Sequence, residues 1–132
     1  MRKVEHIGIA VKDLAVSIPL FERLLDTPCY KTEEVDSEQV TTAFFRKGET
    51  KIELLQGQSP DSVITRFIEK KGEGIHHIAF DVADIYAEMK RLAEAGFTLL
   101  NDQPKQGADN KLICFLHPRD THSVLIELCM ER

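Results

Sequence analysis

The chain has 132 residues, of which 42% are hydrophobic and 30% charged, and its formal net charge is −5. This length suits one domain of common size, and the acidic balance argues against a general nucleic-acid binder, which would normally be basic. No apolar signal region follows the first residue and no segment approaches the apolar run that spans a bilayer, so we expect a cytoplasmic protein.

The first half of the chain is predicted to form a strand, a helix and three more strands. Residues 3–11 are rich in Ile and Val and end at a turn, which is typical of a strand. Asp13 can cap a helix that reaches about Leu25, but Pro19 removes a backbone donor inside it. The helix therefore either starts near Ser17 or has a distorted first turn. The core side of this helix is predicted to carry Leu14, Ile18, Phe21 and Leu25. The three short strands are predicted at 29–35, 39–46 and 50–55.

A linking helix and a second run of the same elements follow. Ser59-Pro60 is a typical helix start, and the helix it predicts ends at about residue 72. The second half opens with a strand over 74–82 and a helix that is capped by Asp84 and stops at Gly96. The remaining strands are predicted at 97–100, 111–117 and 123–129, with a polar loop at 101–110.

Two short motifs occur once in each half of the chain. Residues 5–14 align with residues 76–85, and the segment 51–55 (KIELL) aligns with 125–129 (LIELC). An internal repeat decides the architecture before any other feature does. We therefore predict an α+β fold of two βαβββ repeats, at about 3–57 and 74–130, joined by a linker helix at about 60–72. The whole of 1–132 is expected to be a single domain.

Each repeat contributes one histidine and one glutamate at equivalent positions. His6 points away from the apolar face of its strand, and Glu53 also lies on the non-core face of its own strand. A lone His on a strand is more often structural, but repeat symmetry predicts that His6, Glu53, His77 and Glu127 meet at a common centre. Two imidazoles and two carboxylates suit a divalent metal ion, with cobalt, manganese, zinc and nickel suited comparably.

The other histidines and the cysteines have no such repeat partner. His76 must point to the opposite face of its strand from His77, and we interpret it as a structural histidine. His117 and His122 are expected on the surface or in loops. Three cysteines lack the spacing of a metal or redox motif and are expected to be buried or incidental free thiols: Cys29, Cys114 and Cys129.

With these residues in place, the chain resembles the vicinal oxygen chelate superfamily, also called the glyoxalase fold. More narrowly, the phrases HIGIAVKDL, KIELL, SPDS, KKGEGIHHIAF, FLHP and VLIEL are similar to the methylmalonyl-CoA epimerase family. The resemblance implies one curved mixed sheet around a metal site. It also implies an isomerase that interconverts the epimers of methylmalonyl-CoA by 1,1-proton transfer through a metal-stabilised enolate.

The resemblance also implies a pair of catalytic bases. Epimerisation removes the α-proton from one face of the carbon and returns a proton to the other, so two bases are needed. The two glutamates of the family correspond here to Glu38 and to the ligand Glu127. Glu38 lies in an acidic cluster that could equally be a solvated turn: Glu33, Glu34, Asp36 and Glu38.

The implied partners are an acyl-CoA substrate and a second subunit in a homodimer. Basic residues that are candidates to contact the CoA phosphates are Arg66, Lys70, Lys71, Lys105, Lys111 and Arg119. Two alternatives of the same fold stay open: a glyoxalase-I-type isomerase or lyase on another substrate, and a non-catalytic small-molecule-binding protein.

The chain departs from the family at three places. Members often carry Gly-Gly where this chain has His122-Ser123, a glycine where it has Asp26-Thr27, and no proline at Pro19. The first departure is expected to affect how the acyl group sits, because it adds bulk beside the site.

Overall fold

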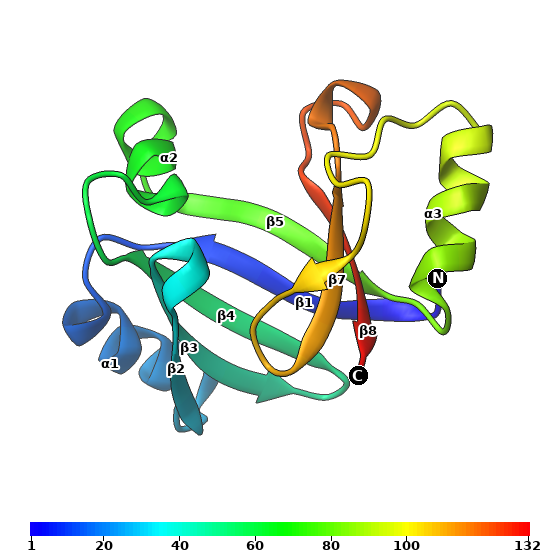
Figure 1. Ribbon diagram of the computed structural model, residues 1–132. Helices are drawn as coiled ribbons and strands as arrows, with labels where there is room; N and C mark the ends of the chain where they lie inside the picture. Colours follow the sequence, from blue (N-terminus) through cyan, green and yellow to red (C-terminus); the bar gives the residue numbers. More distant parts are fainter. The chain divides into compact units, whose positions relative to one another are not determined.

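The elements follow the predicted order, which is strand, helix and three strands, then a linking helix, then the same pattern again (Figure 1). The computed structural model describes residues 1–132. These residues form two compact units. The first-repeat unit comprises residues 6–76, and the second-repeat unit comprises residues 1–5 and 77–132. The boundary falls close to residue 74, where the second repeat was expected to begin.

The first-repeat unit is a mixed four-stranded sheet with two helices. The strands run in the order β2-β3-β4-β1, in which β1 is parallel to β4 and the other neighbours are antiparallel. The element bounds are β1 Lys3–Ala10, α1 Leu14–Leu25, β2 Lys31–Val35, the 3-10 helix η1 Asp36–Glu38, β3 Val40–Lys47, β4 Thr50–Gly57 and α2 Val63–Lys71.

The second-repeat unit has the same order of strands. It runs β5-β8-β7-β6, with β5 parallel to β8 and the other neighbours antiparallel. The element bounds are β5 Gly74–Asp81, α3 Ile85–Glu94, β6 Lys105–Gln106, β7 Lys111–Leu116, the 3-10 helix η2 Pro118–Asp120 and β8 Ile126–Glu131. None of the three α-helices is long and apolar enough to cross a membrane.

Helix α1 begins at Leu14, and Pro19 lies inside it. Asp13 is the N-cap as predicted, with its Oδ1 accepting a hydrogen bond from the Ala15 amide at 2.9 Å. The alternative start near Ser17 is therefore wrong. The helix accommodates the proline because the carbonyl that loses its partner belongs to Ala15, an exposed residue of the first turn where water can bind it.

Helix α2 starts later than its sequence suggested. Its N-cap is Ser62, whose Oγ accepts a hydrogen bond from the Ile64 amide at 3.2 Å. The predicted start at Ser59-Pro60 is wrong because the Ser59 carbonyl is used differently, accepting a hydrogen bond from the Thr65 hydroxyl at 2.8 Å. The segment before Ser62 is thus a turn that is tied back to the helix.

The strand predicted over 97–100 is reduced to a single bridge between Leu99 and Leu116. The amide of Thr98 donates to the carboxylate of Asp120 at 2.8 Å instead of to a strand carbonyl. The Asp120 side chain thus replaces one strand carbonyl as the acceptor for this segment. The β-propensity of residues 97–100 could not predict this replacement.

Two other boundaries in the second repeat also move. The short strand β6, at 105–106, lies inside the predicted loop. Strand β8 starts at Ile126 instead of residue 123, because His122 and Ser123 are left-handed, with φ of 55° and 68°. A left-handed residue cannot continue an extended strand.

Helices α1 and α3 each pack on the sheet of their own unit. The inner face of α1 contacts a core that contains Phe45 and Leu54, both fully buried. Helix α3 packs through Ile85 and Met89 on a core that contains Leu128. The predicted inner positions of α1 all belong to this packing: Leu14, Ile18, Phe21 and Leu25. The prediction of a single domain stays a prediction.

Candidate active site

The register of the first repeat brings His6 and Glu53 together. Glu53 on β4 is paired with Gly8 on the parallel strand β1. Because alternate residues of a strand share a face, His6 lies on the same side as Gly8 and hence as Glu53. The Nδ1 of His6 is 3.2 Å from the Oε2 of Glu53, and the two residues are only 5% and 4% exposed. The glutamate is therefore not a solvated strand end.

The second repeat builds the same pair from equivalent residues. Glu127 on β8 is paired with Ala79 on the parallel strand β5, two residues after His77. The Nε2 of His77 is 3.4 Å from the Oε1 of Glu127, and the two residues are 6% and 4% exposed. In both repeats the residue between the pair is small, so nothing bulky separates the imidazole from the carboxylate.

A phenylalanine flanks each glutamate on the other neighbouring strand. Phe44 on β3 is paired with Glu53, and Phe115 on β7 is paired with Glu127. The ring of Phe115 also meets that of His77 edge-on, with centroids 5.9 Å apart. Neither phenylalanine was predicted from the sequence as part of the site. Phe44 and Phe115 occupy equivalent positions in the two repeats, and this equivalence could have identified them from the sequence.

The donor atoms in each repeat fit a divalent metal ion. An imidazole nitrogen and a carboxylate oxygen converge from two strands, and both side chains are almost fully buried. Buried ionisable groups are kept in proteins mainly when they are paired or bind a metal. An imidazole nitrogen and a carboxylate oxygen are donors that first-row divalent ions accept.

Glu38 is the last residue of η1, and a network of polar groups anchors this turn. Gln39, which follows it, is left-handed with φ of 54°. The Gln39 carbonyl accepts a hydrogen bond from the Gln58 amide at 2.7 Å, and its side chain accepts one from Ser59. Glu38 is half-buried whereas Asp36 is exposed, so the acidic cluster is not a uniformly solvated turn.

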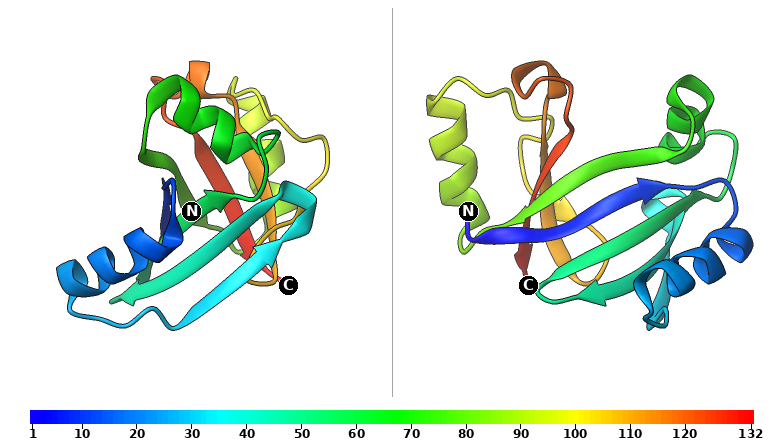
Figure 2. Two further views of the ribbon diagram at one scale, coloured as in Figure 1. Left: turned by 90° about the vertical axis from the view of Figure 1, so that its left-hand side faces the viewer. Right: turned by 180° about the vertical axis from the view of Figure 1, so that it is seen from behind.

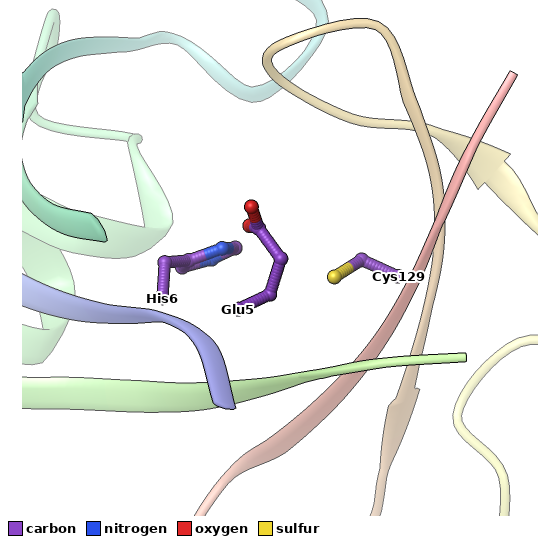
Figure 3. A group of neighbouring side chains, drawn as sticks. All are labelled: Glu5, His6 and Cys129. Carbon is purple, nitrogen blue, oxygen red and sulfur yellow. The ribbon is translucent and has the colours of Figure 1, made fainter. Parts of the chain in front are cut away.

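A carboxylate and a thiol lie side by side in the second-repeat unit, beyond the His77–Glu127 pair. Glu5 is 5% exposed, and its carboxylate lies within 4.8 Å of the Sγ of Cys129, which is fully buried (Figure 3). Burial, followed by the nearby charge of Glu127, raises the pKa of the Cys129 thiol. This thiol is therefore protonated and unreactive. The prediction of free cysteines is confirmed for Cys29, Cys114 and Cys129.

The remaining histidines have structural or surface positions, as predicted. The ring of His76 packs edge-on against Phe67, with centroids 4.9 Å apart. Burial, and to a smaller extent the charge of Lys71, lowers the pKa of His76 to about 4. His117 caps η2 through its Nδ1, which accepts a hydrogen bond from the Arg119 amide, and His122 is exposed.

One of the basic residues considered for phosphate contacts is no longer a candidate. Lys111 is only 6% exposed, and its Nζ is 3.2 Å from the Oε1 of Glu131. Arg66 and Arg119 are exposed. The Arg66 guanidinium is 3.5 Å from Asp61, and that of Arg119 donates to the Thr98 hydroxyl at 3.2 Å and lies 3.9 Å from Asp120.

Comparisons with known proteins agree with this arrangement. Residues 5–115 match the model of the glyoxalase/bleomycin resistance protein/dioxygenase superfamily. An ethylmalonyl-CoA/methylmalonyl-CoA epimerase from Cereibacter sphaeroides is 38% identical over 128 residues, which cover 96% of this chain and 96% of that protein.

Solved structures show the same similarity. A hypothetical protein from Bacillus halodurans has a TM-score of 0.96 and 41% identity, covering 98% of this chain and 94% of that one. A variant of Streptomyces coelicolor methylmalonyl-CoA epimerase, in complex with 2-nitronate-propionyl-CoA, has a TM-score of 0.93 and 31% identity, covering 99% and 98%. The glyoxalase-like fold and the resemblance to methylmalonyl-CoA epimerases are thereby confirmed. The chain belongs to the glyoxalase/bleomycin resistance protein/dioxygenase superfamily.

Proposed function

We propose that this protein is a metal-dependent epimerase that interconverts the epimers of methylmalonyl-CoA. The observation that carries the proposal is the duplicated pair of a buried histidine and a buried glutamate at 3.2 and 3.4 Å. It is supported by the 38% identity to a curated epimerase that acts on ethylmalonyl-CoA and methylmalonyl-CoA. An acyl-CoA substrate agrees with the acyl-CoA analogue bound to the Streptomyces relative.

His6, Glu53, His77 and Glu127 would hold one divalent ion, an inference that rests on repeat symmetry and on the family. When bound, such an ion supplies a Lewis acid that makes the α-proton of a thioester more acidic. All four side chains are almost fully buried, so little bulk water would compete there with the substrate oxygens. Which of cobalt, manganese, zinc and nickel is native stays open to measurement of the metal content.

Glu38 and Glu127 would be the two bases. One carboxylate takes the α-proton, and the electron pair of the C–H bond moves into the thioester to give an enolate. The other carboxylic acid then returns a proton to the opposite face of the same carbon, so that the configuration inverts. The anchored turn that carries Glu38 suits this role, because a base must be held at a fixed position relative to the substrate.

The test is to incubate the metal-loaded protein with methylmalonyl-CoA in heavy water. Deuterium incorporation at the α-carbon is expected to accompany the loss of chirality, to stop on addition of a chelator and to return with a divalent metal. A protein that keeps its metal but catalyses no exchange would contradict the proposed function.

The same experiment separates the proposed function from the two alternatives that share the fold. A glyoxalase-I-type isomerase or lyase would contain metal and turn over a different substrate. A non-catalytic binding protein would bind a small molecule without any exchange. The cytoplasmic location and the homodimer stay predictions.

A further inference from the structure

Lys105 brings a positive charge to the face of the second-repeat unit that carries Glu127. It is paired with Ile113 across the antiparallel strands β6 and β7, and residues directly opposite each other point to the same face. Phe115, two residues after Ile113, shares this face and is paired with Glu127. Figure 2 shows β7, in orange, beside β8, in red. The lysine, the phenylalanine and the glutamate therefore belong to one face of the sheet.

The ammonium group of Lys105 lies close to the proposed base and its histidine. Its Nζ is 5.9 Å from the centroid of the Phe115 ring, within the range of a cation–π contact. The same ring meets the His77 imidazole edge-on, with centroids 5.9 Å apart. The charge of Lys105 is therefore one aromatic ring away from the His77–Glu127 pair.

The backbone that carries Lys105 is held firmly against β7. The amide of Gly107 donates to the carbonyl of Lys111 at 2.9 Å. A Cβ at Gly107 would lie 2.8 Å from the Cγ2 of Ile113, so only glycine lets the chain pack this closely. Lys105 itself is half-buried. Its backbone position is therefore fixed, and its long side chain supplies the reach.

The other lysine of this face is placed differently. Lys111 is only 6% exposed, and its Nζ is 3.2 Å from the Oε1 of Glu131. It precedes Phe115 by four residues, which is about 13 Å along a strand. Its backbone is thus distant from Glu127, and a carboxylate already neutralises its charge. Lys105 is the better placed of the two lysines to meet an anion beside Glu127.

The substrate of the proposed function has one group that needs such a cation. The α-carbon of methylmalonyl-CoA bears a free carboxylate, which an ordinary acyl-CoA lacks. Proton transfer to Glu127 requires this carboxylate to lie near a second carboxylate, which is only 4% exposed. Two carboxylates in a buried site repel each other unless an opposite charge lies nearby. A carboxylate has two oxygens with several acceptor positions, so it can accept from a lysine while it makes other contacts.

We propose that Lys105 binds the free carboxylate of methylmalonyl-CoA and thereby selects malonyl-type thioesters over uncharged acyl-CoA substrates. Such selection is a difference of affinities, and a charge-assisted hydrogen bond to the carboxylate supplies it. The bond also fixes the α-carbon relative to Glu127, because the carboxylate is attached directly to that carbon. This assignment rests on the proposed function, which supplies the substrate.

Binding of two ligands to the metal-loaded protein tests the assignment. In isothermal titration with methylmalonyl-CoA, Lys105→Met should weaken binding by about 10–100-fold, the loss typical of a hydrogen bond between charged groups. Propionyl-CoA is the same thioester without the carboxylate, and Lys105→Met should leave its affinity unchanged. Lys105→Arg keeps the charge and should retain most of the affinity for methylmalonyl-CoA. Lys90→Met, which removes an exposed charge from α3, is the matched control and should bind both ligands normally.

Measuring α-proton exchange in heavy water alongside binding separates a wrong assignment of Lys105 from a wrong proposed function. If the unsubstituted protein exchanges the proton but Lys105→Met binds methylmalonyl-CoA unchanged, the assignment is overturned and the proposed function stands. Equal weakening of both ligands would also overturn it, because Lys105 would then contact the part of CoA that they share. A metal-loaded protein without exchange would contradict the proposed function and this assignment with it.

Discussion

The two repeats agree closely on one face and differ on the other. Each sets a buried histidine beside a buried glutamate, with a small residue paired to the glutamate on one side and a phenylalanine on the other. The outer faces of α1 and α3 share no such agreement, because α1 exposes Val16, Leu20 and Leu24 where α3 carries Ala87, Arg91 and Ala95. Strand register therefore constrains the face that carries the ionisable pair, whereas no such register constrains the outer face of the helix.

Glu53 and Glu127 hold equivalent positions, and the proposed function gives them unequal roles. Glu127 would be both ligand and base, so Glu127→Gln should lower turnover by about 10²–10⁴-fold. Glu53→Gln keeps an amide oxygen as ligand and should lower turnover less than about tenfold. Turnover is measured as α-proton exchange, and the metal content of both variants is determined alongside. Equal losses would mean that the repeats act symmetrically and that Glu127 is not a base.

Glu38 would be the second base, and the equivalent position of the second repeat carries the shorter acid Asp109. Glu38→Gln should keep the metal and lower turnover by about 10²–10⁴-fold, because the amide cannot take a proton. His77→Ala should lose both the metal and the turnover. Metal content and exchange rate together distinguish the two results. Asp36→Asn, in the same acidic turn, is the control and should remain active. A fully active Glu38→Gln variant would show that another residue is the second base.

Leu54 and Leu128 are equivalent core residues, one in each repeat, and both are fully buried. Leu54→Ala and Leu128→Ala should each lower the free energy of unfolding by about 2–5 kcal/mol through lost burial and the cavity left behind. If the chain is one domain, both variants shift a single cooperative transition in denaturant. Two transitions, each sensitive to only one of the variants, would show that the compact units unfold independently.

The left-handed residues before β8 include His122, whose equivalent in the first repeat is Gly48, with φ of 61°. His122 and Ser123 adopt positive φ where family members often have glycine, and a residue with a Cβ is strained there. Ser123→Gly should therefore raise the free energy of unfolding by about 1 kcal/mol. Gly96→Ala is the reverse control, since Gly96 has φ of 99° and should lose stability when it gains a Cβ. Thermal unfolding of both variants measures the two effects. A destabilised Ser123→Gly variant would show that its side chain contributes more than its conformation costs.

The smallest effect is expected at Asp120. The hydrogen bond from the Thr98 amide lowers the pKa of its carboxyl group below the ordinary value. A lowered pKa in the folded state means that the unfolded chain binds the proton more readily. The stabilisation is thus fully present above about pH 4 and is lost as the pH falls through the folded pKa. Asp120→Asn should remove this part of the acid sensitivity, as measured by unfolding at neutral and acidic pH. If the stability of the Asp120→Asn variant fell with acid as much as that of the original protein, the stabilising role of the Asp120 carboxylate would be contradicted.

Predictions from the sequence were correct where they rested on the spacing of residues along the chain. The repeat, the Asp13 and Asp84 caps and the inner face of α1 all depend on residues a few positions apart, and the structure has them as expected. Predictions were wrong where a side chain competes for a backbone hydrogen-bonding group. Thr98 donates to Asp120 instead of to a strand, and the chain before Ser62 forms a turn held by Thr65.

The internal repeat can be read directly from the sequence, and it makes His6 equivalent to His77 and Glu53 equivalent to Glu127. Alternation along a strand says which face a side chain takes, but it says nothing about which strand lies beside it. Only the tertiary structure decided that Gly8 and Ala79 stand opposite the two glutamates and that Phe44 and Phe115 flank them. The parallel pairs β1–β4 and β5–β8 join strands that are distant in the sequence, so no tight turn fixes their register and packing of the sheet must do so.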